Sequence, residues 1–209
     1  MKRYLVIMLV IICFSTACSN QDSASKDMKN EDHSQHMQPA TKREVHWPVE
    51  SFQFKNQDNQ DFGLKDLKGK VWLADFIFSK CETVCPPMTS NLNQLQKIVK
   101  KDKIPLHFVS FSVDPVRDQP QVLKKFGKRY TEDFKSWTLL TGYSKKKIES
   151  FAKNSFKVPV SPSPDPGQFI HGTTFFLVNK QGIIVKTYSG VENPPYEEIK
   201  KDARKLGEE

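Results

Sequence analysis

Two cysteines separated by three residues, Cys81 and Cys85, stand between a long apolar run and the start of a helical pattern. Residues 71–78 are almost all apolar and predict a buried strand, and residues 88–101 carry apolar side chains at helical spacing. The thiols therefore lie where a strand turns into a helix. The free amide groups and the dipole of a helix N-terminus favour the thiolate there. This placement predicts a pair that forms a disulfide, exchanges one or binds a soft metal ion.

Residues 1–17 have the pattern of a secretory signal. Two basic residues precede about 11 apolar ones, and the run ends in small residues before Cys18. A helix that spans a membrane needs about 20 apolar residues, so the run is too short for a permanent anchor. The segment resembles a bacterial lipobox, in which cleavage precedes the cysteine and a lipid joins its sulfur, with Ser15 where that pattern prefers Leu. We expect lipidation at Cys18; ordinary cleavage near Ala17 is the alternative.

The mature chain would then retain two free thiols. Cys13 leaves with the signal and Cys18 carries the lipid, so that Cys81 and Cys85 remain. A cysteine pair in an extracytoplasmic protein is usually a structural disulfide. A bridge across three residues, however, closes a tiny loop and constrains little of the unfolded chain. The spacing therefore favours a reactive role for the cysteine pair over a disulfide that stabilises the fold.

The rest of the chain divides into a tether and one domain. Residues 18–44 are polar and predict a flexible tether, and residues 45–209 have the size of a single domain. His33, His36 and Met37 in the tether offer copper ligands, although a solvated linker that contains histidine explains them as well. The net charge of +8 falls to +6 (8 − 2) without the two basic signal residues, which suits an anionic envelope or simply solubility. No motif indicates nucleic-acid binding.

The domain alternates between strand and helix patterns. Strands are expected at residues 52–54, 62–64, 71–78, 106–113, 137–140, 173–178 and 183–188. Helices are expected at residues 88–101, 122–126, 145–156 and after Pro195, and residues 158–168 are predicted to be irregular. This order predicts an α/β sandwich with a mixed sheet. Functional groups in such sheets gather at the carboxyl ends of strands, which would place Cys81, Cys85 and Asp114 at one edge.

The strand, the cysteine turn, the αβ units and the terminal hairpin together resemble the thioredoxin fold. Two features depart from that pattern, because the cysteine pair has one residue more than C-x-x-C and His171-Gly172 stands where a proline would precede Thr173. Both departures match the SCO/SenC family. The resemblance is carried by three blocks in order: Phe78-x-x-Cys81-x-x-x-Cys85-Pro86, Ser112-Val113-Asp114-Pro115-x-Arg117-Asp118, and His171 six residues before Leu177.

The resemblance implies a thioredoxin-like domain with an N-terminal β-hairpin extension, tethered to the outer side of the bacterial cell membrane. SCO/SenC proteins bind copper and help to assemble the copper A centre of cytochrome c oxidase. By resemblance, Cys81 and Cys85 would be a redox-active pair of thiolate ligands, His171 an imidazole ligand, and Asp114 a residue that tunes the site. Such a donor set suits Cu(I), and Cu(II) with an added oxygen ligand. The implied partners are the oxidase copper A subunit and a thioredoxin-like reductant.

Two functions remain open at this point. One is delivery of copper by ligand exchange, and copper loading would exclude disulfide formation because both use the same thiols. The other is a thiol–disulfide oxidoreductase that reduces the cysteines of the oxidase copper site, with His171 tuning a thiol. A peroxiredoxin-like peroxidase has less support, since nothing near Cys81 resembles the Thr/Arg pair such a site requires. His107 is interpreted as a strand residue and Met88 as a core residue.

Overall fold

The structure is a computed structural model that describes residues 43–209. The signal segment, the lipidation of Cys18 and the ligand set His33, His36 and Met37 lie outside the described residues. Across residues 43–209, no helix is long and apolar enough to cross a membrane.

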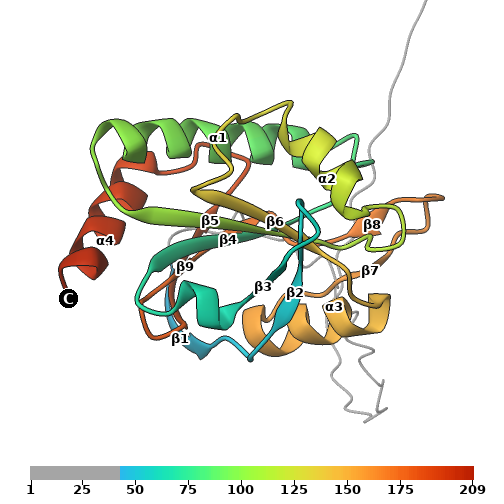
Figure 1. The fold of residues 1–209 in the computed structure, drawn as a ribbon, viewed down its shortest axis with the longest axis horizontal. Coiled ribbons are helices and arrows are strands. Elements are labelled where there is room, and N and C mark those ends of the chain that lie inside the picture. The colour runs from blue at the N-terminus through green and yellow to red at the C-terminus, as the bar shows by residue number, and fades with distance from the viewer. Residues whose placement is uncertain (1–42) are drawn as a thin grey trace, which may run out of the picture. The chain divides into compact units, whose positions relative to one another are not determined.

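An eight-stranded mixed sheet forms the centre of the domain, in the order β1-β10-β9-β4-β5-β6-β2-β3 (Figure 1). Its middle strands are parallel: β4 (Val71–Ile77), β5 (Leu106–Ser112) and β6 (Trp137–Thr141). These strands are covered on both faces, which explains their nearly continuous apolar sequences. Antiparallel strands extend the sheet on both sides: β9 (Thr174–Val178), β10 (Ile183–Ser189) and β1 (Arg43–Pro48) beyond β4, and β2 (Gln53–Asn56) and β3 (Asp61–Gly63) beyond β6.

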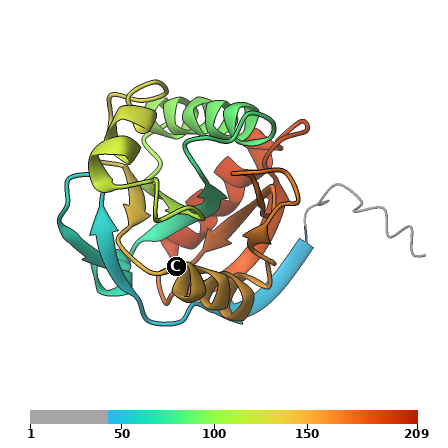
Figure 2. The ribbon, with the colours of Figure 1, turned by 90° about the vertical axis from the view of Figure 1, so that its right-hand side faces the viewer.

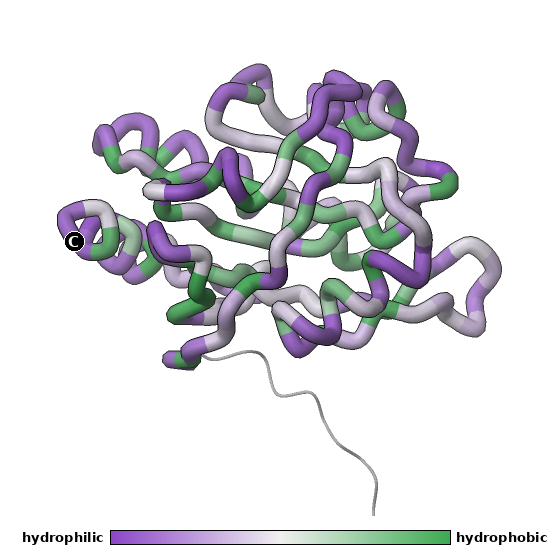
Figure 3. The backbone as a smooth tube through the Cα atoms, turned by 60° about the horizontal axis from the view of Figure 1, so that its bottom comes forward, coloured by the Kyte–Doolittle hydropathy of each residue, from purple (hydrophilic) through white to green (hydrophobic). Residues whose placement is uncertain are grey.

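Helices cover both faces of this sheet. The helices α1 (Cys85–Lys101), α2 (Pro120–Gly127) and α4 (Tyr196–Glu208) pack on one face, and α3 (Lys145–Phe151) packs on the other. Side chains of β4 alternate between the two cores, with Leu73 on the α1 side and Phe76 on the α3 side. Figure 3 shows the hydrophobic residues along the central strands and the hydrophilic ones along the outer helices and loops. The predicted α/β sandwich is confirmed.

The core on the α3 side is strongly aromatic. After Phe151 the helix continues as a π-helical turn, Ala152–Phe156. Residues five apart in an α-helix are rotated by about 140° from each other, whereas the wider π turn returns them to nearly the same side. The rings of Phe151 and Phe156 accordingly meet with centroids 5.6 Å apart, and both contact Phe111. The helix predicted over residues 145–156 is present, with a change of pitch that packs both rings.

Several local features differ from the sequence prediction. The segment expected to be irregular contains a short antiparallel pair, β7 (Ser161–Pro162) and β8 (Phe169–Ile170). Arg43 and Glu44, expected in the tether, begin β1, which pairs with β10. The hairpin predicted from residues 52–54 and 62–64, by contrast, is present as β2–β3. Helix α1 starts at Cys85 rather than at Met88, because two prolines fit its first turn.

The carboxyl ends of β4 and β5 lie at one edge of the sheet. The loop after β4 carries Cys81, the loop after β5 carries Asp114, and the β7–β8 hairpin leads into His171. These segments gather at the right of Figure 1, and Figure 2 looks onto that edge, with α1 and α2 above it and α3 below. The predicted placement of Cys81, Cys85 and Asp114 at this edge is confirmed.

Candidate metal centre

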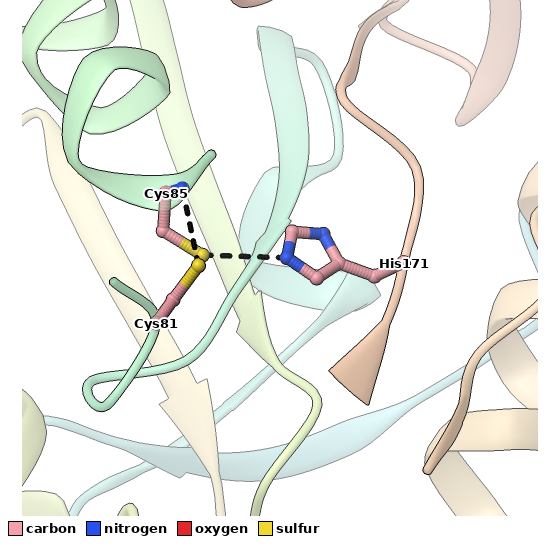
Figure 4. Close-up of side chains that lie close together, drawn as sticks. All are labelled: Cys81, Cys85 and His171. Carbon is pink, nitrogen blue, oxygen red and sulfur yellow. Dashed lines mark hydrogen bonds between the residues drawn. The ribbon is translucent and has the colours of Figure 1, made fainter. Parts of the chain in front are cut away.

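Cys81, Cys85 and His171 meet at this edge (Figure 4). Their ligand atoms, two sulfurs and one ring nitrogen, lie within 4.8 Å of one another. Both cysteines are free thiols, Cys81 is 8% exposed and Cys85 is fully buried. Two neighbouring cysteines and a histidine 86 positions after Cys85 thus form one small, nearly enclosed group of metal-ligand type.

The turn before α1 places both sulfurs. The amide of Cys81 donates to the carbonyl of Phe78 at 3.2 Å, which turns the chain directly after β4. The amide of Cys85, one of the groups left free at a helix start, donates to the sulfur of Cys81 at 3.2 Å. The helix start therefore stabilises negative charge on Cys81, as the sequence predicted.

His171 presents one ring nitrogen to the sulfurs. Its Nδ1 lies 3.0 Å from the carbonyl oxygen of Gly172, and because a carbonyl only accepts, Nδ1 carries a proton. In the neutral ring Nε2 then has a free lone pair, and it lies 3.3 Å from Sγ of Cys85. The ring also packs edge-on against Phe78, with centroids 5.7 Å apart. A backbone bond thus sets the tautomer that a metal ligand needs.

The two thiols differ in acidity. Hydrogen bonding from the Cys85 thiol, with further bonds from backbone amides, lowers the pKa of Cys81 to about 3. Burial raises the pKa of Cys85 far above its ordinary value, and the sulfur of Cys81 beside it raises it further. The pair therefore gives up its first proton readily and its second with difficulty, and the resulting charge is held mainly on Cys81.

This asymmetry predicts selective alkylation of the metal-free, reduced protein. At pH 5 to 6 an ordinary thiol is almost entirely protonated and slow, whereas Cys81 remains a thiolate. We expect iodoacetamide to modify Cys81 at least tenfold faster than Cys85, measured by peptide mass spectrometry over a time course. Equal rates for the two cysteines, or a Cys81 rate that rises with pH up to about 8.5, would contradict the lowered pKa.

Asp114 is buried near the site but is not one of the three grouped ligands. Its carboxylate accepts a hydrogen bond from Nε of Arg117, and its backbone amide donates to Oγ of Ser112 at 3.1 Å. A tuning role for Asp114 stays a prediction, and any such role runs through Arg117 and the loop that both residues share.

Two further buried carboxylates were missed by sequence reasoning. Asp118 accepts hydrogen bonds from the amide and hydroxyl of Ser79 and from the hydroxyl of Ser112, and burial raises its pKa. Asp75 is fully buried in β4, and its Oδ1 accepts a hydrogen bond from Ser110 at 2.5 Å, whereas its Oδ2 has no partner. A charged residue within the apolar run at 71–78 was the available signal for Asp75.

Other singled-out residues lie away from the site. His107 is in β5, where Nε2 is 3.0 Å from the hydroxyl of Thr138 and the ring stacks on Phe62. Met88 is fully buried in the core beneath α1. Both interpretations, as a strand residue and a core residue, are confirmed. His46 is exposed on β1.

The SCO1/SenC family model matches residues 40–207 of this chain, which include the whole site. The chain belongs to the SCO1/SenC family. Among solved structures it is similar to a SCO1/SenC family lipoprotein from Bacillus anthracis, with 51% identity, a TM-score of 0.76, and coverage of 80% of this chain and 99% of that one.

Two more Sco structures are informative. BsSco, described as a Sco family cytochrome c oxidase assembly protein with a disulfide switch, is 46% identical with a TM-score of 0.73, over 82% of this chain and 99% of its own. Yeast Sco1 with copper bound is 26% identical with a TM-score of 0.62, over 74% of this chain and 87% of its own. The expected thioredoxin-like fold and the family resemblance are both confirmed.

Proposed function

We propose that this SCO1/SenC protein is a membrane-tethered copper carrier that matures the copper A centre of cytochrome c oxidase. The observation that carries the proposal is the donor set itself, two sulfurs and one ring nitrogen that lie within 4.8 Å of one another. Thiolate and imidazole ligands suit copper in either oxidation state that the family resemblance implies. Support for the partner comes from BsSco, which is named as an oxidase assembly protein, and from yeast Sco1, which holds copper.

The acidity of the two thiols suits reversible loading. Cys81 already carries negative charge and attracts a cation, whereas Cys85 gives up its proton only when a positive charge lowers its pKa. Three protein ligands leave room for a ligand of the recipient, because structural sites usually use four. Copper held this way is released by ligand exchange, as a carrier requires.

The same thiols would gate loading. Forming the Cys81–Cys85 disulfide removes two protons and two electrons and leaves no thiolate for copper, so the oxidised chain requires a dithiol reductant of the thioredoxin type before it loads. The disulfide switch named for BsSco supports this step. We further propose that Cys18 is lipidated and holds the domain on the extracytoplasmic side of the bacterial cell membrane, consistent with the lipoprotein from B. anthracis.

A second function has one specific observation in its favour. A slightly exposed cysteine of low pKa beside a fully buried partner is the arrangement of an attacking and a resolving thiol. The chain would then reduce the disulfide of the oxidase copper site, becoming oxidised itself as the recipient gains two electrons and two protons.

Copper transfer separates the two functions. Copper-loaded protein is mixed with the reduced, copper-free domain of the oxidase copper A subunit, and metal distribution and copper A absorption are followed for wild type, His171→Ala and the control His46→Gln. We expect transfer by wild type and His46→Gln, and at least a tenfold loss of stoichiometric loading in His171→Ala. The outcome would identify a reductase if wild type kept its copper instead of transferring it, and if wild type and His171→Ala reduced an oxidised recipient equally well.

A further inference from the structure

The hairpin that carries His171 is small and needs outside support. Its strands β7 and β8 have two residues each and pair only with one another, so they are not part of the main sheet. A two-stranded ribbon is marginal by itself in water. Since His171 directly follows β8, whatever holds this hairpin also sets the distance between the imidazole and the sulfurs.

Arg117 contacts the hairpin at two points. Its Nη2 donates to the carbonyl oxygen of Gly167, in the loop between β7 and β8. Its guanidinium carbon lies 5.9 Å from the ring centroid of Phe169 in β8. Gly167 has φ +75°, and a Cβ added there would lie 2.9 Å from Nη1 of Arg117. The backbone of the hairpin therefore approaches the guanidinium closely at a position that suits glycine.

Aromatic contacts continue from the hairpin to the imidazole. Phe169 packs against Phe78 with ring centroids 5.4 Å apart, and Phe78 packs against His171 at 5.7 Å. A shift of the hairpin would therefore also move the ring that supports the imidazole. Arg117 is itself fixed, because its Nε donates to the buried carboxylate of Asp114.

The loop that bears Arg117 is also tied to the cysteine turn. Asp118, one residue on, accepts two hydrogen bonds from Ser79, the amide at 3.1 Å and the hydroxyl at 2.5 Å. Ser79 lies two residues before Cys81. The loop at residues 114–118 thus holds the cysteine turn through Asp118 and the histidine hairpin through Arg117, so it spans the two halves of the site.

We propose that Arg117 is a positioning residue for the metal site: anchored on Asp114, it holds the β7–β8 hairpin so that His171 stays in ligating reach of the cysteine pair. The inference rests on the copper site of the proposed function. Arginine is suited to this task because one planar group donates to a carboxylate and to a carbonyl while its face covers a ring, whereas lysine lacks the second fixed donor. Without Arg117, His171 loses its position relative to the sulfurs, whereas Cys81 and Cys85 keep theirs.

The test compares Arg117→Gln, Arg117→Lys and a matched control, Arg129→Gln. Arg129 also lies over aromatic rings, at 4.8 Å from that of Phe126, but follows the far end of α2. We expect copper dissociation into excess chelator to accelerate at least tenfold in both Arg117 variants and less than twofold in the control. Nitrogen coupling in the EPR spectrum of the Cu(II) form should weaken only in the Arg117 variants. Wild-type dissociation in Arg117→Gln, or full rescue by Arg117→Lys, would overturn the assignment.

Hydrogen exchange of the metal-free protein supplies an independent readout. We expect amides in residues 161–171 to exchange at least tenfold faster in Arg117→Gln than in wild type or Arg129→Gln, while β4 and β5 keep their protection. Unchanged exchange there, or equal loosening of the central strands, would reduce Arg117 to a general stabilising role and overturn the proposal. If the wild type bound no copper, the proposed function would fail, and this exchange comparison would still decide the role of Arg117.

Discussion

Cys85→Ser is expected to lower the affinity of the reduced protein for Cu(I) at least 1000-fold, which corresponds to about 4 kcal/mol. The substitution keeps nearly the same shape but replaces a soft sulfur donor with a hard hydroxyl, which does not ionise near neutral pH. Cys85 is fully buried as the first residue of α1, and its sulfur lies 3.3 Å from Nε2 of His171. The substitution therefore removes one of the three grouped donors.

The measurement is competition for Cu(I) against a chromogenic chelator under anaerobic conditions. Met88→Leu is the matched control, because it removes another buried sulfur from α1, outside the ligand group, and roughly conserves volume. We expect the control to stay within twofold of wild type and thermal unfolding of metal-free Cys85→Ser to change by only a few degrees. Wild-type affinity in Cys85→Ser, or a comparable loss in Met88→Leu, would remove Cys85 from the ligand set.

The centre of the fold was predictable because its strands are buried on both faces. Residues 71–77 and 106–112 are mostly apolar and buried, and in α/β proteins the loops at the carboxyl ends of such strands carry the functional residues. The Cys81–Cys85 spacing followed by two prolines marked the helix start, and the family resemblance added His171. The structure brings these three residues together as that reasoning expected.

The parts that were missed depend on tertiary contacts. The sequence of β1 alternates only briefly, with Val45 and Trp47 partly buried, and its pairing with β10 uses backbone groups that every residue carries. The two-residue strands β7 and β8 are defined by one another and by Arg117, with a proline in one of them. No local pattern distinguishes the burial of Asp118 from that of an exposed acid, because its burial depends on segments that are distant in sequence.

Asp75→Asn is expected to alter the pH dependence of stability by up to about 4 kcal/mol. Burial raises the pKa of the Asp75 carboxyl from 3.8 to about 7, only partly offset by the hydrogen bond from Ser110. Each unit of pKa difference between folded and unfolded states corresponds to about 1.4 kcal/mol, which sets the size of the effect. Between pH 4 and pH 7 the folded chain holds a proton that the unfolded chain has lost, so wild-type stability falls as the pH rises.

Asparagine carries no charge at any pH and does not share this decline. We therefore expect the free energy of unfolding of Asp75→Asn, relative to wild type, to rise by about 2–4 kcal/mol between pH 4 and pH 8, measured by denaturant titration at each pH. This difference between two pH values cancels any fixed cost of fitting the amide beside Ser110. A pH-independent offset between the two proteins would show that Asp75 ionises normally.

Asp133→Asn provides a control, because the pKa of Asp133 is shifted in the opposite direction from that of Asp75. Its carboxylate bonds to Lys100 at 2.8 Å, which lowers the pKa of Asp133, so the group is charged in both states above pH 5. Its replacement should change stability by the same small amount at pH 5 and pH 8. The contrast between the two variants isolates burial as the cause of the pH dependence.

The charge of Asp75 also affects the metal site. Ionised Asp75 raises the pKa of Cys85, so Asp75→Asn should let that thiol ionise at a lower pH than in wild type.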